Sequence, residues 1–230
     1  MTDTAPVINT WNEGPLHAAL KAWYAQPGDA LEVPVDGYII DIVRGDVLIE
    51  IQTRGFTALK DKLAALTRTH PVRLVYPIAQ EKWIVKLAED GESALSRRKS
   101  PKRGSIEQIF DELVRIPDML AQPNFTLEVV FIHEEEVRRH DARRRWRRKG
   151  WVTHERRLIE VVAQRRFTSP EDVRALIPAS LAEPFTTAEL TAHIPGGLRR
   201  AYRMVYCLRA MGLLTATGKR GRATLYRQTG

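Results

Sequence analysis

Two short runs of β-branched residues, separated by a turn, constrain the fold of this chain more than any other feature. The runs YIIDIV and VLIEIQ lie on either side of Arg44-Gly45-Asp46. β-Branched residues favour strands, and a glycine-containing turn between two such runs is typical of a hairpin. We therefore expect antiparallel strands near residues 38–43 and 47–53.

This hairpin predicts which polar side chains meet. If Gly45 and Asp46 form a two-residue turn, Asp41 faces Glu50 across the pair of strands. Gln52 then projects from the same face as Glu50, because side chains alternate along a strand. The other residues of both strands are nearly all apolar, and a sheet covered on both faces should not bury two carboxylates without a function. The competing interpretation is that both acids are the solvent-facing members of an alternating hairpin.

Helices and further strands are predicted around the hairpin. Apolar residues recur at helical spacing in 14–25, and a stripe of leucines in 56–66 predicts a helix packed on a sheet. The segment HPVRLVYPI is typical of a buried strand that follows a crossover helix. We expect shorter strands at 82–87 and 126–132 and a helix over IEQIFDELVRIPDML. The predicted fold class is therefore α/β, with a mixed sheet flanked by helices.

The segment from about 35 to 80 resembles the PD-(D/E)XK nuclease superfamily, which has a restriction-endonuclease-like fold. The core of that superfamily is a helix, a hairpin carrying Asp and then Glu-x-Lys, a helix and a further strand. Asp41 matches the Asp position, and Glu50-Ile51-Gln52 matches the Glu-x-Lys motif. The resemblance implies a metal-dependent endonuclease with Asp41, Glu50 and Gln52 as catalytic residues. Asp36 is the rival for the Asp position, and we favour Asp41 on register.

The resemblance also implies a cofactor, Mg²⁺ or Mn²⁺. Hydrolysis of a phosphodiester is assisted by a divalent cation that polarises a phosphoryl oxygen and lowers the pKa of an attacking water. Hard oxygen ligands hold such a cation. The two carboxylates of Asp41 and Glu50 and the carbonyl of Ile51 are the expected ligands.

The chain departs from the superfamily pattern at Gln52, where lysine is usual. Glutamine can position a water but cannot neutralise an anion. The candidates to supply the positive charge of the usual lysine are Arg54, Lys60 and, on the preceding helix, Lys21. The superfamily often adds an acidic or polar residue from the first helix, for which the candidates are Glu13 and His17.

The last forty-odd residues carry a different pattern. Thr186 and Glu189 have the spacing of a capping box at the start of a helix, and Pro195-Gly196-Gly197 forces a turn before a second helix. Two short strands are then predicted around Gly218-Lys219-Arg220-Gly221. This order of helix, turn, helix and basic hairpin, over about 185–228, resembles a winged helix-turn-helix.

The resemblance implies duplex DNA as the partner, and basic side chains occupy the surfaces that would meet it. A winged helix used only for protein contacts is the alternative. The exposed stripe of the second helix is basic and aromatic, the hairpin tip is basic, and a further basic segment, SRRKSPKRG, lies at 96–104. The predicted DNA-binding residues are Arg199, Arg200, Tyr202, Arg203, Lys219, Arg220, Arg222, Arg97, Arg98 and Lys99.

Charge is distributed unevenly along the chain, whose formal net charge is +8. Residues 1–90 contain 9 Lys and Arg against 12 Asp and Glu, and the remaining residues contain 27 against 16. A basic C-terminal part is typical of a phosphate-binding surface. With a single cysteine, Cys207, no leader-like segment and no long apolar run, we expect a cytoplasmic protein without a membrane partner.

These patterns predict a loose tail over 1–12, a nuclease-like domain over 13–135, an arginine-rich linker over 136–150, and a helical winged domain over 151–230. Within the last, the segment WVTHERRLIEVVAQRRF is expected to be helical. The favoured function is metal-dependent cleavage of DNA. The alternatives are a catalytically inactive DNA-binding regulator that uses the sheet domain for homodimerisation or partner binding, and a scaffold that does not touch nucleic acid.

Overall fold

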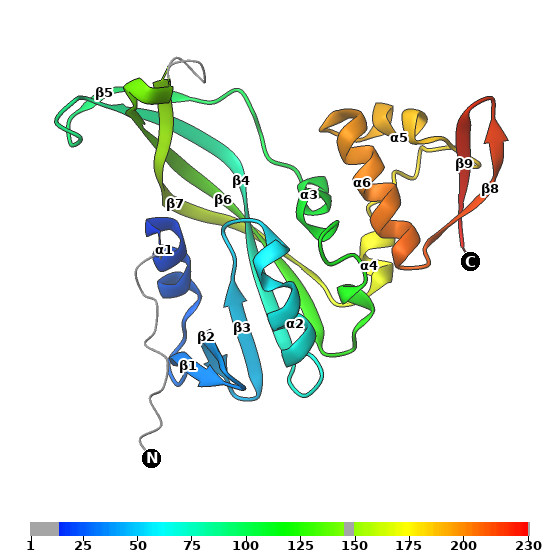
Figure 1. The fold of residues 1–230 in the computed structure, drawn as a ribbon, viewed down its shortest axis with the longest axis horizontal. Coiled ribbons are helices and arrows are strands. Elements are labelled where there is room, and N and C mark those ends of the chain that lie inside the picture. The colour runs from blue at the N-terminus through cyan, green and yellow to red at the C-terminus, as the bar shows by residue number, and fades with distance from the viewer. Residues whose placement is uncertain (1–13, 145–149, 230) are drawn as a thin grey trace.

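The computed structural model describes residues 14–144 and 150–229. In this part of the chain, a large mixed sheet is flanked by helices, and a smaller C-terminal unit packs beside it (Figure 1). The mixed α/β class predicted from the sequence is confirmed. The predicted tail, Glu13 and residues 145–149 of the predicted linker lie outside the described residues.

The described residues form a seven-stranded sheet in the order β1-β2-β3-β4-β6-β7, with β5 paired to β4. Pairing is antiparallel from β1 to β3, parallel from β3 through β4 to β6, and antiparallel between β6 and β7. The strands are β1 (Ala30–Val35), β2 (Tyr38–Arg44), β3 (Val47–Ile51), β4 (Val72–Leu87), β5 (Ala94–Lys99), β6 (Phe125–His140) and β7 (Trp151–Phe167).

The N-terminal half follows the order helix, three antiparallel strands, helix, parallel strand. Helix α1 (Pro15–Tyr24) precedes β1–β3, and a 3-10 turn, η2 (Phe56–Leu59), with helix α2 (Lys60–Leu66) connects β3 to β4. Leu59, Leu63 and Leu66 are buried as expected. Strand β1 was not predicted. It contains Pro34 and lies at the edge of the sheet, where proline is tolerated because one side of the strand needs no hydrogen-bond partner.

Strands β4, β6 and β7 are unusually long, at 16, 16 and 17 residues, and extend beyond the helices as an arm (Figure 1). The segment expected as a separate strand at 82–87 is the distal half of β4, with a register shift near Gln80. Strand β5 pairs with that half, so the predicted basic loop begins as a strand whose side chains are all exposed. Val85, Leu87 and Val137 form a small core within the arm.

The helix predicted for residues 151–167 is wrong, because this segment is strand β7. Its pairing with β6 has register shifts that leave one extra residue at each of 154, 159 and 162. An extra residue in a β-bulge breaks the alternation of faces. Leu158 and Val161, three apart, therefore pack against the same apolar cluster and imitate helical spacing.

The same correction moves the boundary between the two units. Residues 136–140 of the predicted linker belong to β6, and the sheet continues to Phe167, well past the predicted limit at 135. The helix expected over 106–120 is divided into η3 (Ile106–Ile109), α3 (Phe110–Leu113) and η4 (Met119–Ala121). Pro117, which cannot donate a backbone hydrogen bond, lies in the break.

The C-terminal unit contains three helices and a hairpin. These are α4 (Pro170–Arg174), α5 (Thr187–His193), α6 (Gly197–Ala210), β8 (Leu214–Arg220) and β9 (Ala223–Gln228). The predicted capping box is present: Glu189 N donates to Thr186 Oγ1 at 3.2 Å, and Thr186 N donates to Glu189 Oε2 at 2.7 Å. Phe185 pairs with Tyr226 of β9 and so ties the start of α5 to the hairpin. One apolar core runs continuously from the sheet through α3 into α6. None of the described helices combines the length and apolar character needed to cross a bilayer.

Candidate active site

A pocket of about 760 Å³ opens where α1, β2, β3 and β7 meet. Its walls carry both acidic and basic side chains. The polar side chains that the argument needs come from His17 and Lys21 of α1, Asp41, Glu50, Gln52 and Arg54 of the hairpin segment, and His154 and Arg156 of β7.

The hairpin has the expected register. Ile42 pairs with Ile49 and Arg44 with Val47 around the Gly45-Asp46 turn, so the next pair along the strands is Asp41 with Glu50. Both acids line the pocket together with Gln52. The sequence therefore predicted correctly that these three residues meet. Asp36, the rival for the Asp position, lies outside the pocket and binds His70 at 2.9 Å.

Asp41 is held in place from two directions. Its Oδ2 accepts a hydrogen bond from the backbone N–H of Ile51 at 2.7 Å, and His17 Nε2 lies 3.1 Å from the same oxygen. Helix α1 therefore supplies His17 to the acid pair. His17 and Glu13 were the two residues considered as the polar contribution of the first helix.

Glu50 is the most perturbed group of the site. Burial and, to a smaller extent, the negative charge of Asp41 raise the pKa of Glu50 to about 7, although the positive charges of Lys62 and His17 oppose the rise. Glu50 Oε2 is buried and has no hydrogen-bond partner. The other oxygen, Oε1, lies 2.7 Å from Lys62 Nζ.

Lys62 is the site residue that sequence reasoning missed. It projects from α2, where it also donates to the carbonyl of Ile39 at 2.6 Å, and only 13% of its side chain is exposed. A signal was present, since Lys62 adjoins the buried Leu63 on the crossover helix. The charge on Lys62 becomes informative only once the hairpin beneath the helix is known to carry an acid pair.

The basic residues considered as substitutes for the usual lysine occupy other positions or bind other partners. Arg54 is exposed at the rim of the pocket, and Lys21 forms an ion pair with Glu32 at 2.7 Å. Lys60 lines a separate hollow on the other side of α2. The Gln52 side chain donates to the carbonyl of Gly55 at 2.9 Å.

The donor set fits a small, hard cation. Over the described ranges, no group of three or more His, Cys, Asp or Glu side chains is arranged to hold a metal. Mg²⁺ commonly uses one or two carboxylates and completes its shell with water and substrate phosphate. Asp41 and Glu50 supply two carboxylates, Ile51 lines the same pocket, and the unpartnered Glu50 Oε2 is an oxygen that a cation would satisfy.

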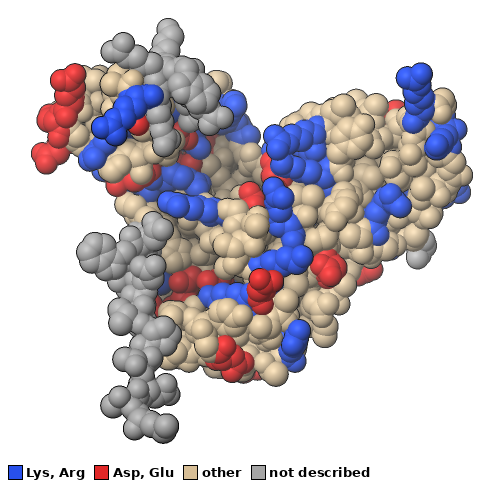
Figure 2. Space-filling view, viewed as in Figure 1, with Lys and Arg blue, Asp and Glu red and all other residues tan. Residues whose placement is uncertain are grey.

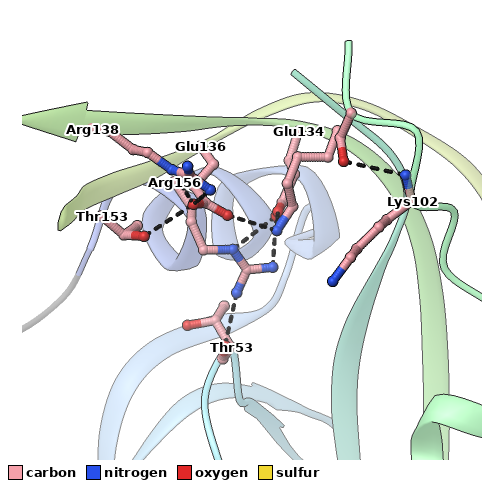
Figure 3. A network of polar contacts seen from close by, with 9 residues as sticks. Thr53, Lys102, Glu134, Glu136, Arg138, Thr153 and Arg156 are labelled. Carbon is pink, nitrogen blue, oxygen red and sulfur yellow. Dashed lines mark hydrogen bonds and ion pairs between the residues drawn. The ribbon is translucent and has the colours of Figure 1, made fainter. Parts of the chain in front are cut away.

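A second charged cluster lies beside the pocket, on β4, β6 and β7 (Figure 3). Arg156 donates from Nε to Glu134 Oε2 at 2.8 Å and from Nη1 to the Thr53 carbonyl at 3.0 Å. Lys82 Nζ lies 2.9 Å from Glu134 and 2.9 Å from Glu136. The cluster connects β7 to the residue that follows Gln52.

Figure 2 shows a hollow between the sheet arm and the C-terminal unit, with Lys and Arg side chains on both sides of it. The predicted DNA-binding residues belong to β5 on the arm and to α6 and the β8–β9 hairpin in the C-terminal unit. On the arm, Arg97, Arg98 and Lys99 are exposed. Arg97 is also held by Glu135 at 2.6 Å, and Lys99 is paired with Glu81.

The residues predicted on α6 divide into two groups. Arg199 is exposed and Tyr202 is 59% exposed. Arg200 and Arg203 instead donate to the two carboxylate oxygens of Asp111 on α3, each at 2.7 Å. These two arginines hold the C-terminal unit against the sheet. On the hairpin, Lys219, Arg220 and Arg222 are exposed, and Arg220 lies 2.5 Å from Glu189.

Comparison with known proteins places the sheet unit in a family. Residues 14–168 match the family described as "Domain of unknown function (DUF8091)", a range that ends where β7 ends. An uncharacterized protein of Treponema pallidum (strain Nichols) is 36% identical over 222 residues, which cover 96% of this chain and 87% of that protein. No solved structure matches the chain. The chain is a member of the DUF8091 family.

Proposed function

We propose that this chain binds duplex DNA and hydrolyses its phosphodiester bonds with Mg²⁺ or Mn²⁺, as a variant of the PD-(D/E)XK type. The observation that carries the proposal is the acid pair. Two carboxylates share one pocket, and one of them has a raised pKa and a buried oxygen without a partner. Like charges held this close are stabilised by a cation between them.

The order of elements supports the same proposal. Helix α1, the antiparallel strands, helix α2 and the parallel strand β4 follow one another as in the superfamily core, with Asp41 on β2 and Glu50 on β3. The C-terminal order of α5, a turn, α6 and a basic hairpin supports DNA binding.

Each site residue then has a role set by its contacts. A bound divalent cation would polarise the scissile phosphoryl group and acidify a water, and Asp41 and Glu50 would hold it. His17 orients Asp41, and Lys62 places a positive charge beside Glu50, where Gln52 cannot. Gln52 lines the same pocket, where its side chain would position a water molecule or hold the Gly55 carbonyl.

A second candidate function is a DNA-binding regulator without catalysis, in which the sheet serves homodimerisation or partner binding. The hydrogen bond between the Gln52 amide and the Gly55 carbonyl favours it, because this contact occupies the side chain that stands at the usual lysine position.

A plasmid cleavage assay separates the two functions. The wild type should nick or linearise DNA in Mg²⁺ or Mn²⁺ but not in EDTA, and Asp41→Asn and Glu50→Gln should abolish cutting. Asp46→Asn, which changes an exposed acid in the turn of the same hairpin, is the matched control and should cut normally. Binding without cutting by the wild type would favour the regulator.

A further inference from the structure

Strand β7 delivers consecutive residues to the pocket through a bulge. Arg138 of β6 pairs with Thr153 and Val137 with Glu155, so His154 is an extra residue between them. The four residues from Thr153 to Arg156 all line the pocket. Bulges often re-aim side chains beside functional sites, and here one brings a guanidinium to a wall that α1, β2 and β3 do not build.

Arg156 is anchored by two partners, the Glu134 carboxylate and the Thr53 carbonyl. Its Nε lies 2.8 Å and its Nη2 2.5 Å from Glu134 Oε2, and its Nη1 donates to the Thr53 carbonyl. A guanidinium has five N–H donors, so these contacts leave two. The side chain is 29% exposed and belongs to the wall of the pocket.

The anchor is costly to build. Glu134 is fully buried, and a buried carboxylate requires paired charges and hydrogen bonds to offset its desolvation. Lys82 and Arg156 both supply charge to it. The contacts with Glu134 and Thr53 hold the guanidinium in place at the pocket wall.

We propose that Arg156 binds a non-bridging phosphate oxygen of the DNA backbone in this pocket, held in position by Glu134. The inference rests on the proposed function and deepens it by naming the substrate group and the residue that receives it. The guanidinium matches a phosphate in geometry and charge. It also contacts Thr53, the residue next to Gln52, and so supplies positive charge close to the motif position that lacks lysine.

Binding of an uncleaved duplex in Ca²⁺ tests this assignment over a range of salt concentrations. Each phosphate contact contributes about 0.9 to the slope of log affinity against log salt. Arg156→Gln should make this salt dependence less steep by about that amount. It should also weaken binding about tenfold at fixed salt. Arg156→Lys should recover part of both. Arg165→Gln, at the far end of the same strand and exposed, is the control and should keep the wild-type slope.

Loss of Arg156 leaves Glu134 with one partner fewer, so the double variant Glu134→Gln/Arg156→Gln removes both charges and guards against misfolding. It should show the same reduced slope as Arg156→Gln. A wild-type slope in either folded variant, or an equal loss in Arg165→Gln, would overturn the role of Arg156. A wild type that binds no duplex would overturn the proposed function as well. Binding without cleavage would remove only the nuclease step, and the salt dependence of binding would still test the role of Arg156.

Discussion

Lys62 Nζ lies 2.7 Å from Glu50 Oε1, although the two residues come from different elements, helix α2 and strand β3. This ion pair places a cation at the acid pair from the crossover helix instead of from position 52. It also explains why the departure at Gln52 does not leave the site without a nearby positive charge.

Replacing Lys62 should therefore impair catalysis. Lys62→Met removes the charge that opposes the rise of the Glu50 pKa, and it should lower kcat for DNA cleavage by about a hundredfold, the scale of a lost electrostatic contact at a reacting centre. Lys62→Arg should retain part of the activity. Lys60→Met, on the same helix but facing another hollow, should cleave at the wild-type rate, and an equal loss in both Met variants would point to helix damage.

The pKa of Glu50 makes stability depend on pH with a defined sign. Because the folded-state pKa, about 7, is raised above the ordinary value of 4.5, the protonated form favours folding. Its contribution is present below pH 4.5 and is lost as the pH rises through 7. Without metal, the free energy of unfolding of Glu50→Gln, relative to that of the wild type, should increase by about 2 to 3 kcal/mol between pH 5 and pH 8. Urea unfolding at both pH values measures this gain, and a difference that does not change with pH would contradict the assignment.

Asp111 should contribute to stability through the contact between the two units. Burial would raise its pKa, but hydrogen bonds from Arg200 and Arg203 outweigh this and lower the pKa. Its contribution is therefore present above the ordinary pKa and is lost as the pH falls through the lowered one. Asp111→Asn should lower the free energy of unfolding by about 2 kcal/mol at pH 7, because the partly buried arginines lose a charged partner. Asp118→Asn, an exposed acid nearby, should cost little in the same unfolding assay.

The basic residues of the C-terminal unit divide into exposed ones and ones that bind Asp111, and the two groups should affect DNA binding differently. Arg199→Gln and Arg222→Gln should each lower the salt slope of duplex binding by about 0.9, because these side chains are exposed. Arg203→Gln should instead lower the free energy of unfolding, since Arg203 is occupied by Asp111. Electrophoretic shifts at several salt concentrations, read beside unfolding curves, distinguish the two groups. A slope loss confined to Arg203→Gln would contradict the division.

The elements that local patterns determine were predictable. The β2–β3 hairpin follows from its β-branched runs and its turn, α2 from its leucine stripe, and the start of α5 from Thr186 and Glu189. These signals depend only on residues close in sequence, so the meeting of Asp41 and Glu50 could be derived before the fold was known.

What escaped prediction depends on distant contacts. The bulges of β7 give Leu158 and Val161 helical spacing, and only pairing with β6 shows that the segment is a strand. The roles of Lys62 and Arg156 depend on Glu50 and Glu134, which the fold brings to them from other elements. Likewise, the exposed stripe expected on α6 loses Arg203 to Asp111, which also binds Arg200, because α3 packs against that helix.

Binding of Mn²⁺, followed by electron paramagnetic resonance at pH 8, tests the proposed acid-pair metal site most directly. The wild type should bind one Mn²⁺ per chain at this site, with affinity falling as the pH drops below 7 and Glu50 becomes protonated. Asp41→Asn and Glu50→Gln should lose that ion, and Asp46→Asn should retain it. Equal Mn²⁺ binding by the wild type and both site variants, or none by the wild type, would contradict the site.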